Sequence, residues 1–185
     1  MTAKESWKKV WKFLWHDDSL ASWVVSLILA FIIVKFIFFP LLSLVFGTAL
    51  PLVIVESESM HHPGFLGNIV GSSNSFNQWW DDKGGWYEGE GINKTKVESW
   101  PLKNGLEMGD IVIVKRASNL RIGDIIIFNA NQNNPIIHRI IDIKKKENGI
   151  YYATKGDNNN GQLSVEKEIS ESQIIGKAIW RIPKV

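Results

Sequence analysis

The feature that most constrains this chain is an apolar run from Leu20 to Val55, in which Lys35 is the only charged residue. As a helix, its 36 residues would span about 54 Å, whereas a hydrocarbon core is roughly 30 Å thick and needs only about 20 apolar residues. A cleavable signal peptide has an apolar region of only about 7 to 15 residues. The run therefore predicts a permanent anchor, with one transmembrane helix in residues 19–46 and an extended segment after it.

Residues 1–18, which precede the span, predict a short amphipathic helix at the membrane surface. Its apolar side chains recur at helical spacing, and they are Trp7, Val10, Trp11, Leu14 and Trp15. Tryptophan is typical of the headgroup region, although a soluble helix packed on the domain would show the same stripe. The basic residues before the span are Lys4, Lys8, Lys9 and Lys12. By the positive-inside rule we expect a single-pass protein of the cell membrane with a cytoplasmic N-terminus and an extracellular main domain.

Residues 47–185 are expected to form that exterior domain. Beyond residue 108, short β-branched runs alternate with turn residues, which is the pattern of strands. The runs are residues 110–115, 123–129, 135–143, 150–155 and 174–182. Residues 61–108 are rich in Gly, Asn and Trp without clear periodicity, so we interpret them as an irregular, Trp-rich insertion. The predicted fold is mainly β, on a single N-terminal transmembrane helix.

Composition and spacing argue against several classes of function. The formal charge is only +2 and the basic residues are scattered, so no nucleic-acid partner is expected. The chain has no cysteine, which excludes disulfides and thiolate metal sites. Its histidines lack an H-x-x-x-H or comparable ligand spacing, so we expect no metal and no other cofactor.

Serines and histidines crowd directly after the apolar run. A serine nucleophile needs a base to take its proton and a third group to orient that base. Ser59 is the candidate nucleophile, but no strand holds its neighbours His61 and His62. His138 lies in a predicted apolar strand, where its neutral form is favoured and its ring is held. Asp157 ends another strand and could reach His138 across a hairpin, although each residue alone reads as a core histidine or a turn residue.

Several segments, in this order, resemble the conserved boxes of type I signal peptidases. They are Ser-Glu-Ser-Met at 57–60 after an apolar span, Gly-Asp-Ile-Val-Ile-Val at 109–114, Ile-Ile-His-Arg-Ile-Ile at 136–141, Thr-Lys-Gly-Asp-Asn-Asn at 154–159 and Ile-Ile-Gly-Lys-Ala at 174–178. The resemblance runs from about residue 45 to the C-terminus, apart from the insertion. Bacterial members have lysine where this chain has His138, so the chain is more similar to the archaeal and endoplasmic-reticulum branch, and the insertion looks archaeal.

The resemblance implies a signal-peptidase-like β catalytic domain and a membrane serine endopeptidase, a hydrolase of protein secretion. Such an enzyme removes signal peptides from exported preproteins at the outer face of the membrane. By position, Ser59 is the nucleophile, His138 the general base and Asp157 the acid that orients or supports it. The oxyanion donors are the Ser59 backbone N–H and the Ser57 hydroxyl. The implied partners are secretory preproteins, membrane lipids and the protein-export machinery.

The chain departs from the family pattern at three positions. Many relatives have a second aspartate soon after the pair that matches Gly156-Asp157. No aspartate follows here before Glu166, so Asp157 is expected to act alone. The glycine usual between the two serines is Glu58, whose charge would affect substrate preference. Because His61 and His62 displace the usual proline to position 63, the expected substrate-binding residues are Met60, His61 and His62.

Alternatives remain open at this point. Lys115 and Lys155 are rival bases, since burial would lower the pKa of a lysine. The same motifs fit a specialist peptidase of this family with few substrates. A non-enzymatic, membrane-anchored binding module could use the β domain to display the insertion. The tryptophans at 79, 80, 86 and 100 have two interpretations. They could form a lip that dips into the membrane or lines a substrate groove, or they could pack the insertion onto the domain.

Overall fold

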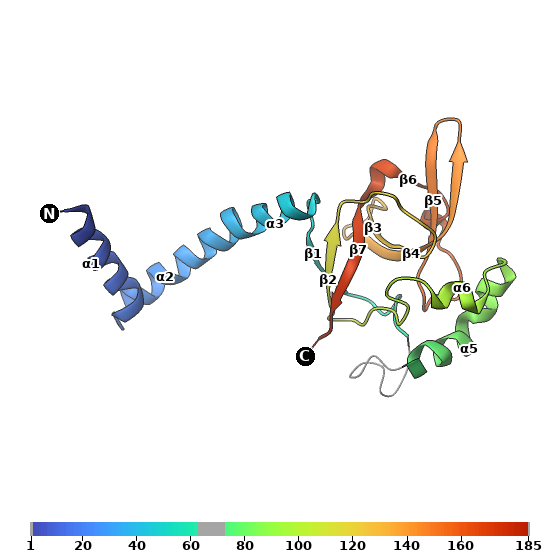
Figure 1. Cartoon of the computed structure of the whole chain (residues 1–185), viewed down its shortest axis with the longest axis horizontal. Helices are drawn as coiled ribbons and strands as arrows, with labels where there is room; N and C mark the ends of the chain where they lie inside the picture. Colours follow the sequence, from blue (N-terminus) through green and yellow to red (C-terminus); the bar gives the residue numbers. More distant parts are fainter. Residues whose placement is uncertain (1, 63–72, 185) are drawn as a thin grey trace. The chain divides into compact units, whose positions relative to one another are not determined.

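The structure is a computed structural model that describes residues 2–62 and 73–184. The chain divides into two compact units, Met1–Val45 and Phe46–Val185. Helices make up the first unit, and the second contains the strands (Figure 1).

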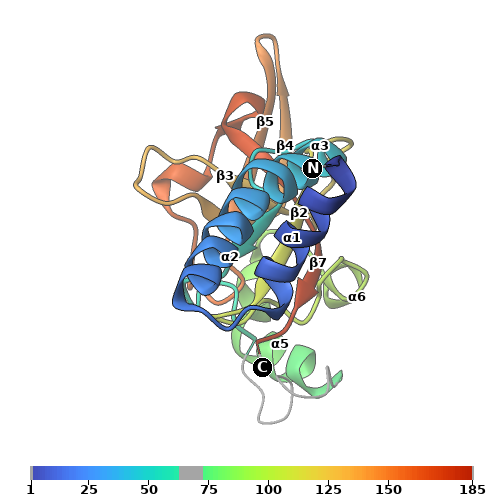
Figure 2. The same ribbon diagram turned by 90° about the vertical axis from the view of Figure 1, so that its left-hand side faces the viewer.

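The N-terminal unit begins with the amphipathic helix α1, Ala3–His16. Its exposed tryptophans follow one another by a turn, with ring centroids 6.5 Å apart for Trp7 and Trp11 and 5.6 Å apart for Trp11 and Trp15. On another side α1 lies beside α2, Leu20–Ile33 (Figure 2), where the Ser26 hydroxyl donates to the Leu14 carbonyl at 3.4 Å. The exposed aromatic stripe is therefore left for contacts outside this helix pair.

The apolar run forms one continuous helical segment from Leu20 to Phe46. It consists of α2, the π-helical turn η1 (Val34–Phe38) and α3 (Phe39–Phe46). Ser19 caps its start by accepting from the Ser22 N–H at 3.2 Å, and Gly47 follows its end at a φ of +63°. The 27 residues Leu20–Phe46 are long and apolar enough to cross a membrane, which confirms the predicted N-terminal helix of spanning length.

The second unit is built on a curled antiparallel sheet. Among the described residues it has seven strands, in the order β1-β2-β7-β3-β4-β5-β6. They are β1 (Leu52–Ile54), β2 (Ile111–Lys115), β3 (Ile125–Phe128), β4 (Ile136–Lys146), β5 (Gly149–Lys155), β6 (Ile169–Ser170) and β7 (Ile174–Ile182), and short 3-10 turns η2 (Ser164–Glu166) and η3 (Glu171–Gln173) flank β6. The mainly β fold is confirmed.

Both faces of the central strand β3 are buried. Its side chains alternate, so Ile125 and Ile127 enter one apolar cluster while Ile126 and Phe128 enter another. This explains why β3 is a continuous apolar run rather than an alternating one. The next strand, β4, is paired with β3 so that His138 stands opposite Ile126.

The buried Asp110, just before β2, connects the start of β2 with the C-terminal segment after β7 and with the backbone that follows β1. Asp110, fully buried, accepts from the backbone N–H groups of Glu107 and Lys184 at 2.7 and 3.0 Å and pairs with Arg181 at 2.9 Å. Its own carbonyl accepts from the Val55 N–H at 2.9 Å. The Gly109-Asp110 pair therefore fixes the backbone at Val55, just before the candidate nucleophile Ser59.

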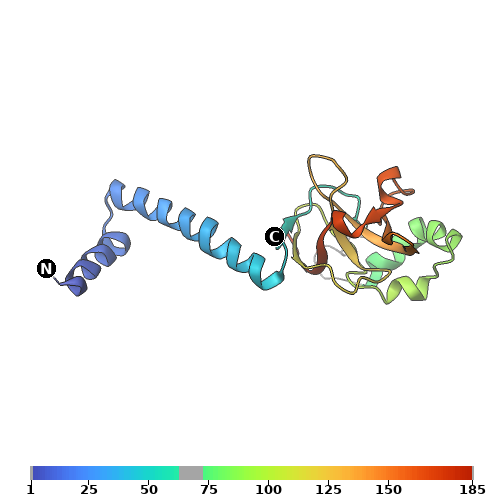
Figure 3. The same ribbon diagram turned by 90° about the horizontal axis from the view of Figure 1, so that it is seen from above.

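The insertion is helical where we expected irregular structure. It forms α5 (Ser73–Gly89) and α6 (Lys94–Glu98), shown side by side in green in Figures 1 and 3. Sequence analysis missed α5 because Gly84 and Gly85 interrupt its pattern. A Cβ on Gly84 would lie 2.5 Å from the Trp80 ring, so this glycine makes room for the tryptophan. Residues 63–72 of the predicted insertion, with Pro63, lie outside the described residues.

The tryptophans of the insertion pack on the β domain. Trp79, Trp80 and Trp100 are at most 7% exposed, and they share an apolar cluster with Ile141 and Ala153 of the sheet. The half-buried Trp86 lies against the same cluster. A lip that dips into the membrane is thus wrong for these residues, and the packing alternative holds.

Candidate active site

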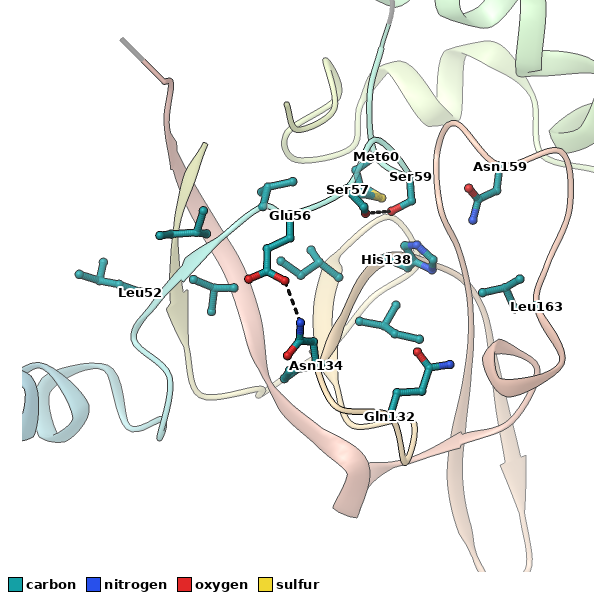
Figure 4. Close-up of a pocket in the computed structure, with 16 residues that line it drawn as sticks. Leu52, Glu56, Ser57, Ser59, Met60, Gln132, Asn134, His138, Asn159 and Leu163 are labelled. Carbon is teal, nitrogen blue, oxygen red and sulfur yellow. Dashed lines mark hydrogen bonds between the residues drawn. The ribbon is translucent and has the colours of Figure 1, made fainter. Parts of the chain in front are cut away.

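A groove of about 620 Å³ lies beside β1 and contains both Ser59 and His138 (Figure 4). Three parts of the chain line it: residues 52–57 with 59 and 60, residue 132 with 134–138, and the loop with Asn159 and Leu163. Most of the lining is apolar. Among the described residues, no group of three or more His, Asp or Glu side chains is placed to hold a metal ion.

The backbone around Ser59 is held from two sides. The Ser59 carbonyl accepts from the Asn158 N–H at 2.8 Å, and the Asn158 side-chain amide donates to the Glu58 carbonyl at 3.1 Å. On the other side, the Met60 carbonyl accepts from the Leu106 N–H at 2.8 Å. The Met60 side chain lines the groove and is anchored in the core with 1% of its surface exposed. These contacts fix the turn that presents the Ser59 hydroxyl.

The hydroxyls of Ser57 and Ser59 lie 3.1 Å apart at the rim of the groove. Figure 4 shows the two side chains turned toward one another, above the His138 ring. Ser57 therefore stands where it can donate to an oxygen that develops beside Ser59.

His138 is buried on β4, with its ring oriented by a carboxylate. Its Nδ1 is hydrogen-bonded to Glu166, a buried residue of η2. Glu166 also accepts from the Leu163 N–H at 2.5 Å and the Thr154 hydroxyl at 3.4 Å, so its position is fixed independently of the histidine. The bond at Nδ1 leaves Nε2 of His138 as the ring nitrogen available to the groove.

Gly156 allows the His138 ring to approach the Ser59 turn. A Cβ at position 156 would lie 2.7 Å from His138 Nε2 and 2.8 Å from the Ser59 carbonyl oxygen. Both atoms thus border the same small space, and any larger residue there would push them apart. The Gly156-Asp157 pair thus borders this site through its glycine.

Asp157 does not meet His138 as we expected. Its buried carboxylate pairs with Arg139 at 2.7 Å and accepts from His62 Nε2 at 3.0 Å and the Tyr87 hydroxyl at 3.3 Å. Burial alone would raise the pKa of Asp157, but the charge of Arg139 and hydrogen bonds from His62 and Arg139 outweigh it and hold this pKa well below its usual range.

Strand alternation explains why Asp157 pairs with Arg139 and does not meet His138. Neighbouring residues on β4 point to opposite faces of the sheet, so His138 and Arg139 face different partners. Glu166 stands on the histidine side and Asp157 on the arginine side. The acid that contacts His138 is therefore Glu166, which sequence analysis noted only as the next acidic residue after Asp157.

Neither nearby histidine lines the groove. His62 is buried against Trp79, with the rings stacked at 4.1 Å, and burial lowers the pKa of His62 although its bond to Asp157 opposes this. His61 is half-buried and its Nδ1 lies 2.6 Å from the Glu107 carboxylate. The His62 side chain thus faces helix α5, and the His61 side chain faces the loop before β2. The third expected contact, Met60, does border the groove.

The two rival lysines also lie outside the groove. Burial lowers the pKa of Lys155 to about 8, yet its ammonium donates to the Gly156 carbonyl at 3.0 Å and lies over the rings of Trp86 and Tyr87 at 5.0 and 4.9 Å. Lys115 is exposed at the end of β2. Neither lysine stands among the residues around Ser59.

The fold and site together define a mainly β protein with a helix of membrane-spanning length and a groove lined by a serine and a histidine. No family model matches the chain. It is 38% identical over 85 residues to "Signal peptidase complex catalytic subunit sec11" of Dictyostelium discoideum, covering 42% of this chain and 48% of the relative. It is 31% identical over 102 residues to "Signal peptidase complex catalytic subunit SEC11C" of Homo sapiens, covering 48% and 51%.

A bacterial protein is similar as well. "Signal peptidase I W" of Bacillus subtilis (strain 168) is 33% identical over 72 residues, covering 37% of this chain and 38% of the relative. The chain thus spans about half, or less, of the length of the curated relatives it matches. These matches confirm the resemblance to type I signal peptidases, in particular to the endoplasmic-reticulum-like branch.

Proposed function

We propose that this protein is a membrane-bound serine endopeptidase that removes N-terminal signal peptides from exported preproteins at the outer face of the membrane. The observation that carries the proposal is that Ser59 and a His138 ring held by buried Glu166 line the same groove. The similar proteins that are named signal peptidases support the same activity. The helix Leu20–Phe46 supports the membrane location.

In the proposed reaction His138 Nε2 takes the proton of the Ser59 hydroxyl as its oxygen attacks the scissile carbonyl carbon. His138 then gives this proton to the leaving amine, and the new N-terminus departs. Water, deprotonated by the same nitrogen, hydrolyses the acyl-enzyme. Glu166 accepts from Nδ1–H throughout, which sets the tautomer of His138 and stabilises the imidazolium.

The proposed oxyanion donors are the Ser59 backbone N–H and the Ser57 hydroxyl. The 3.1 Å separation of the two serine oxygens puts Ser57 within reach of the oxygen that forms on the scissile carbon. Removing one such donor typically lowers kcat by about 10²- to 10³-fold. We expect Ser57→Ala to act in this way, with little change in folding because Ser57 is exposed.

Asp157 has a positioning role in this proposal. Its carboxylate is neutralised by Arg139, and the loop that carries it donates from Asn158 to the Ser59 carbonyl. Asp157 thus supports the nucleophile's turn through the backbone rather than through the histidine. This replaces our expectation that it orients His138.

The proposed setting is the cell membrane, with a cytoplasmic N-terminus and an extracellular catalytic domain. The exposed tryptophans of α1 suit the headgroup layer, and lysines beside them suit anionic lipids. Secretory preproteins are the proposed substrates, and lipids and the protein-export machinery the proposed partners. A panel of preproteins separates a general enzyme from a specialist with few substrates.

The test is cleavage of a preprotein in vesicles by the full chain. We expect processing by the wild type and none above background by Ser59→Ala or His138→Ala. The matched control is Ser118→Ala, which removes an exposed serine that does not line the groove. Processing by Ser59→Ala at the wild-type rate would refute the proposal. Binding of preproteins without Ser59-dependent cleavage would favour a binding module.

A further inference from the structure

The insertion carries one sequence motif that the proposed reaction does not use. Asn93-Lys94-Thr95 is the only Asn-x-Ser/Thr triplet in the chain, and it lies where α6 begins. Such a triplet is the acceptor sequence for N-glycosylation, which joins a glycan to the asparagine side chain. Short triplets also arise by chance, so the surroundings of Asn93 decide whether it can accept a glycan.

The Asn93 side chain has one free polar atom, and it is the atom that N-glycosylation modifies. Its Oδ1 accepts from the Lys96 N–H at 2.9 Å and thereby caps α6. An N–H donor requires an oxygen here, which assigns the two ends of the amide. Among the described residues, no hydrogen bond engages Nδ2. A glycan replaces one Nδ2 hydrogen and leaves Oδ1 in place, so the cap and the glycan are compatible.

Asn93 and Thr95 are both exposed, while the residues that fix this segment are buried. Ile92 and Val97 enter the apolar cluster of the insertion, and the Ile92 N–H donates to the Tyr87 carbonyl at 2.9 Å. The two side chains that define the triplet are therefore presented to solvent from a fixed backbone. Helix α6 has only five residues, and so short a helix has little stability of its own, so its first turn can extend during transfer.

The triplet is separate from the groove. None of its three residues lines the groove, and none of its described hydrogen bonds reaches a lining residue. A glycan is bulky and hydrophilic, so it suits a surface that stays in water. In the proposed topology the insertion lies outside the cell, where secreted proteins carry such glycans.

We propose that Asn93 is an N-glycosylation site, so that the insertion carries a glycan on its exposed surface. The inference rests on the membrane side assigned in the proposed function and is independent of the reaction in the groove. In the transfer, Nδ2 forms a bond to the anomeric carbon of a glycan that is carried on a lipid phosphate. The bond between that carbon and the phosphate oxygen breaks, the lipid phosphate leaves with the electron pair, and a base of the transferase takes one amide proton.

The test is mass spectrometry of the full chain, isolated from the membranes of the cells that produce it naturally. We expect the intact mass to exceed the 21.0 kDa of the polypeptide by at least one sugar residue, and peptide fragmentation to place that mass on Asn93. Asn93→Gln and Thr95→Ala, made in the same cells, are expected to lose the added mass completely. Thr95→Ser keeps a hydroxyl at the third position of the triplet and is expected to retain it.

Two further variants separate glycosylation from folding. Asn93→Asp keeps an oxygen that caps α6 but has no amide nitrogen, so it should lose the glycan without a change in the circular dichroism spectrum. Asn133→Gln is the matched control, because it removes an exposed asparagine outside any such triplet, and it should keep the wild-type glycan. A wild-type chain without added mass, or added mass that persists in Asn93→Gln, would overturn the inference.

Glycosylation and cleavage are measured separately, so the two proposals can fail independently. A glycan on Asn93 without Ser59-dependent cleavage of any preprotein would refute the proposed reaction alone. Cleavage by a wild-type chain that carries no glycan would refute this inference alone.

Discussion

At the scale of single residues, two buried carboxylates have separate environments that assign them separate tasks. Glu166 contacts a histidine and neutral donors, while Asp157 faces a guanidinium. The first arrangement suits a group that stabilises an imidazolium formed during a reaction. The second suits a permanent ion pair. Substituting each by its amide therefore separates catalysis from stability.

For Glu166→Gln we expect kcat for preprotein cleavage to fall by about 10²-fold or more, with a much smaller change in KM. The amide cannot stabilise the imidazolium, and its NH₂ group can bind the unprotonated Nδ1 and favour the wrong tautomer. The measurement is steady-state kinetics, with circular dichroism to verify the fold. Equal kcat values for variant and wild type would contradict the assignment of Glu166 to His138.

For Asp157→Asn we expect a loss of about 3–5 kcal/mol in the free energy of unfolding, because Arg139 keeps its charge and stays buried. Chemical denaturation of the detergent-solubilised chain measures it. The matched control is Glu168→Gln, since Glu168 pairs with Lys146 at 2.6 Å on the surface, where such pairs contribute only about 0–1 kcal/mol. A loss no larger than in this control would contradict the buried-pair argument.

The depressed pKa of Asp157 also fixes the sign of a pH effect. A carboxyl whose pKa is lower folded than unfolded contributes stability that is complete above the unfolded pKa, about 3.9, and that is lost as the pH falls toward the folded value. We therefore expect the stability gap between wild type and Asp157→Asn to be constant near neutral pH and to shrink below about pH 4. Denaturation at several pH values measures this gap, and a gap that widens in acid would contradict it.

At the scale of elements, helix α5 is a support for the site. Trp79 donates from its indole N–H to the Asp157 carbonyl at 3.0 Å, and its ring covers His62. The helix is thus connected to the loop that holds the Ser59 turn. Its two adjacent glycines differ in what surrounds them, which provides a matched pair of substitutions.

We expect Gly85→Ala to stabilise the protein by about 0.5–1 kcal/mol, because nothing lies within 4 Å of the new Cβ and alanine favours helix. Gly84→Ala should instead destabilise it, since its Cβ would lie 2.5 Å from the buried Trp80 ring. Denaturation midpoints measure both changes. Stabilisation by both alanines would show that Trp80 does not pack as described.

Elements and residues differed in how far the sequence predicted them. β-branched runs predicted strands because that signal is local, and the spanning helix followed from its length. Helix α5 was missed because two glycines interrupt its pattern, and the reason for Gly84, the room it makes for Trp80, is visible only in three dimensions. His138 could be found from its place in an apolar strand. The acid beside it could not, because Glu166 reaches His138 across 28 residues through a loop whose course no local pattern specifies.

At the scale of the whole molecule, the anchor and the groove belong to separate compact units, yet the proposed reaction needs both. Each unit has its own contacts: the helix pair α1 and α2 in one, and the sheet with its insertion in the other. The residues of the proposed reaction all lie within Phe46–Val185. In the proposed function, the contribution of the first unit is therefore to confine the groove to the surface where membrane-bound substrates lie.

This division predicts different losses for different substrates when residues 1–45 are removed. Confinement raises effective concentration without changing any contact in the groove, so cleavage of a vesicle-bound preprotein should fall by about 10²-fold or more. A short soluble peptide spanning the cleavage site gains nothing from confinement, so its kcat/KM should change little. The same two assays with Ser59→Ala give the background rates. Equal losses for both substrates would mean that the helical unit supports the fold of the groove instead of its location, and an unfolding measurement on the truncated chain would then show lower stability.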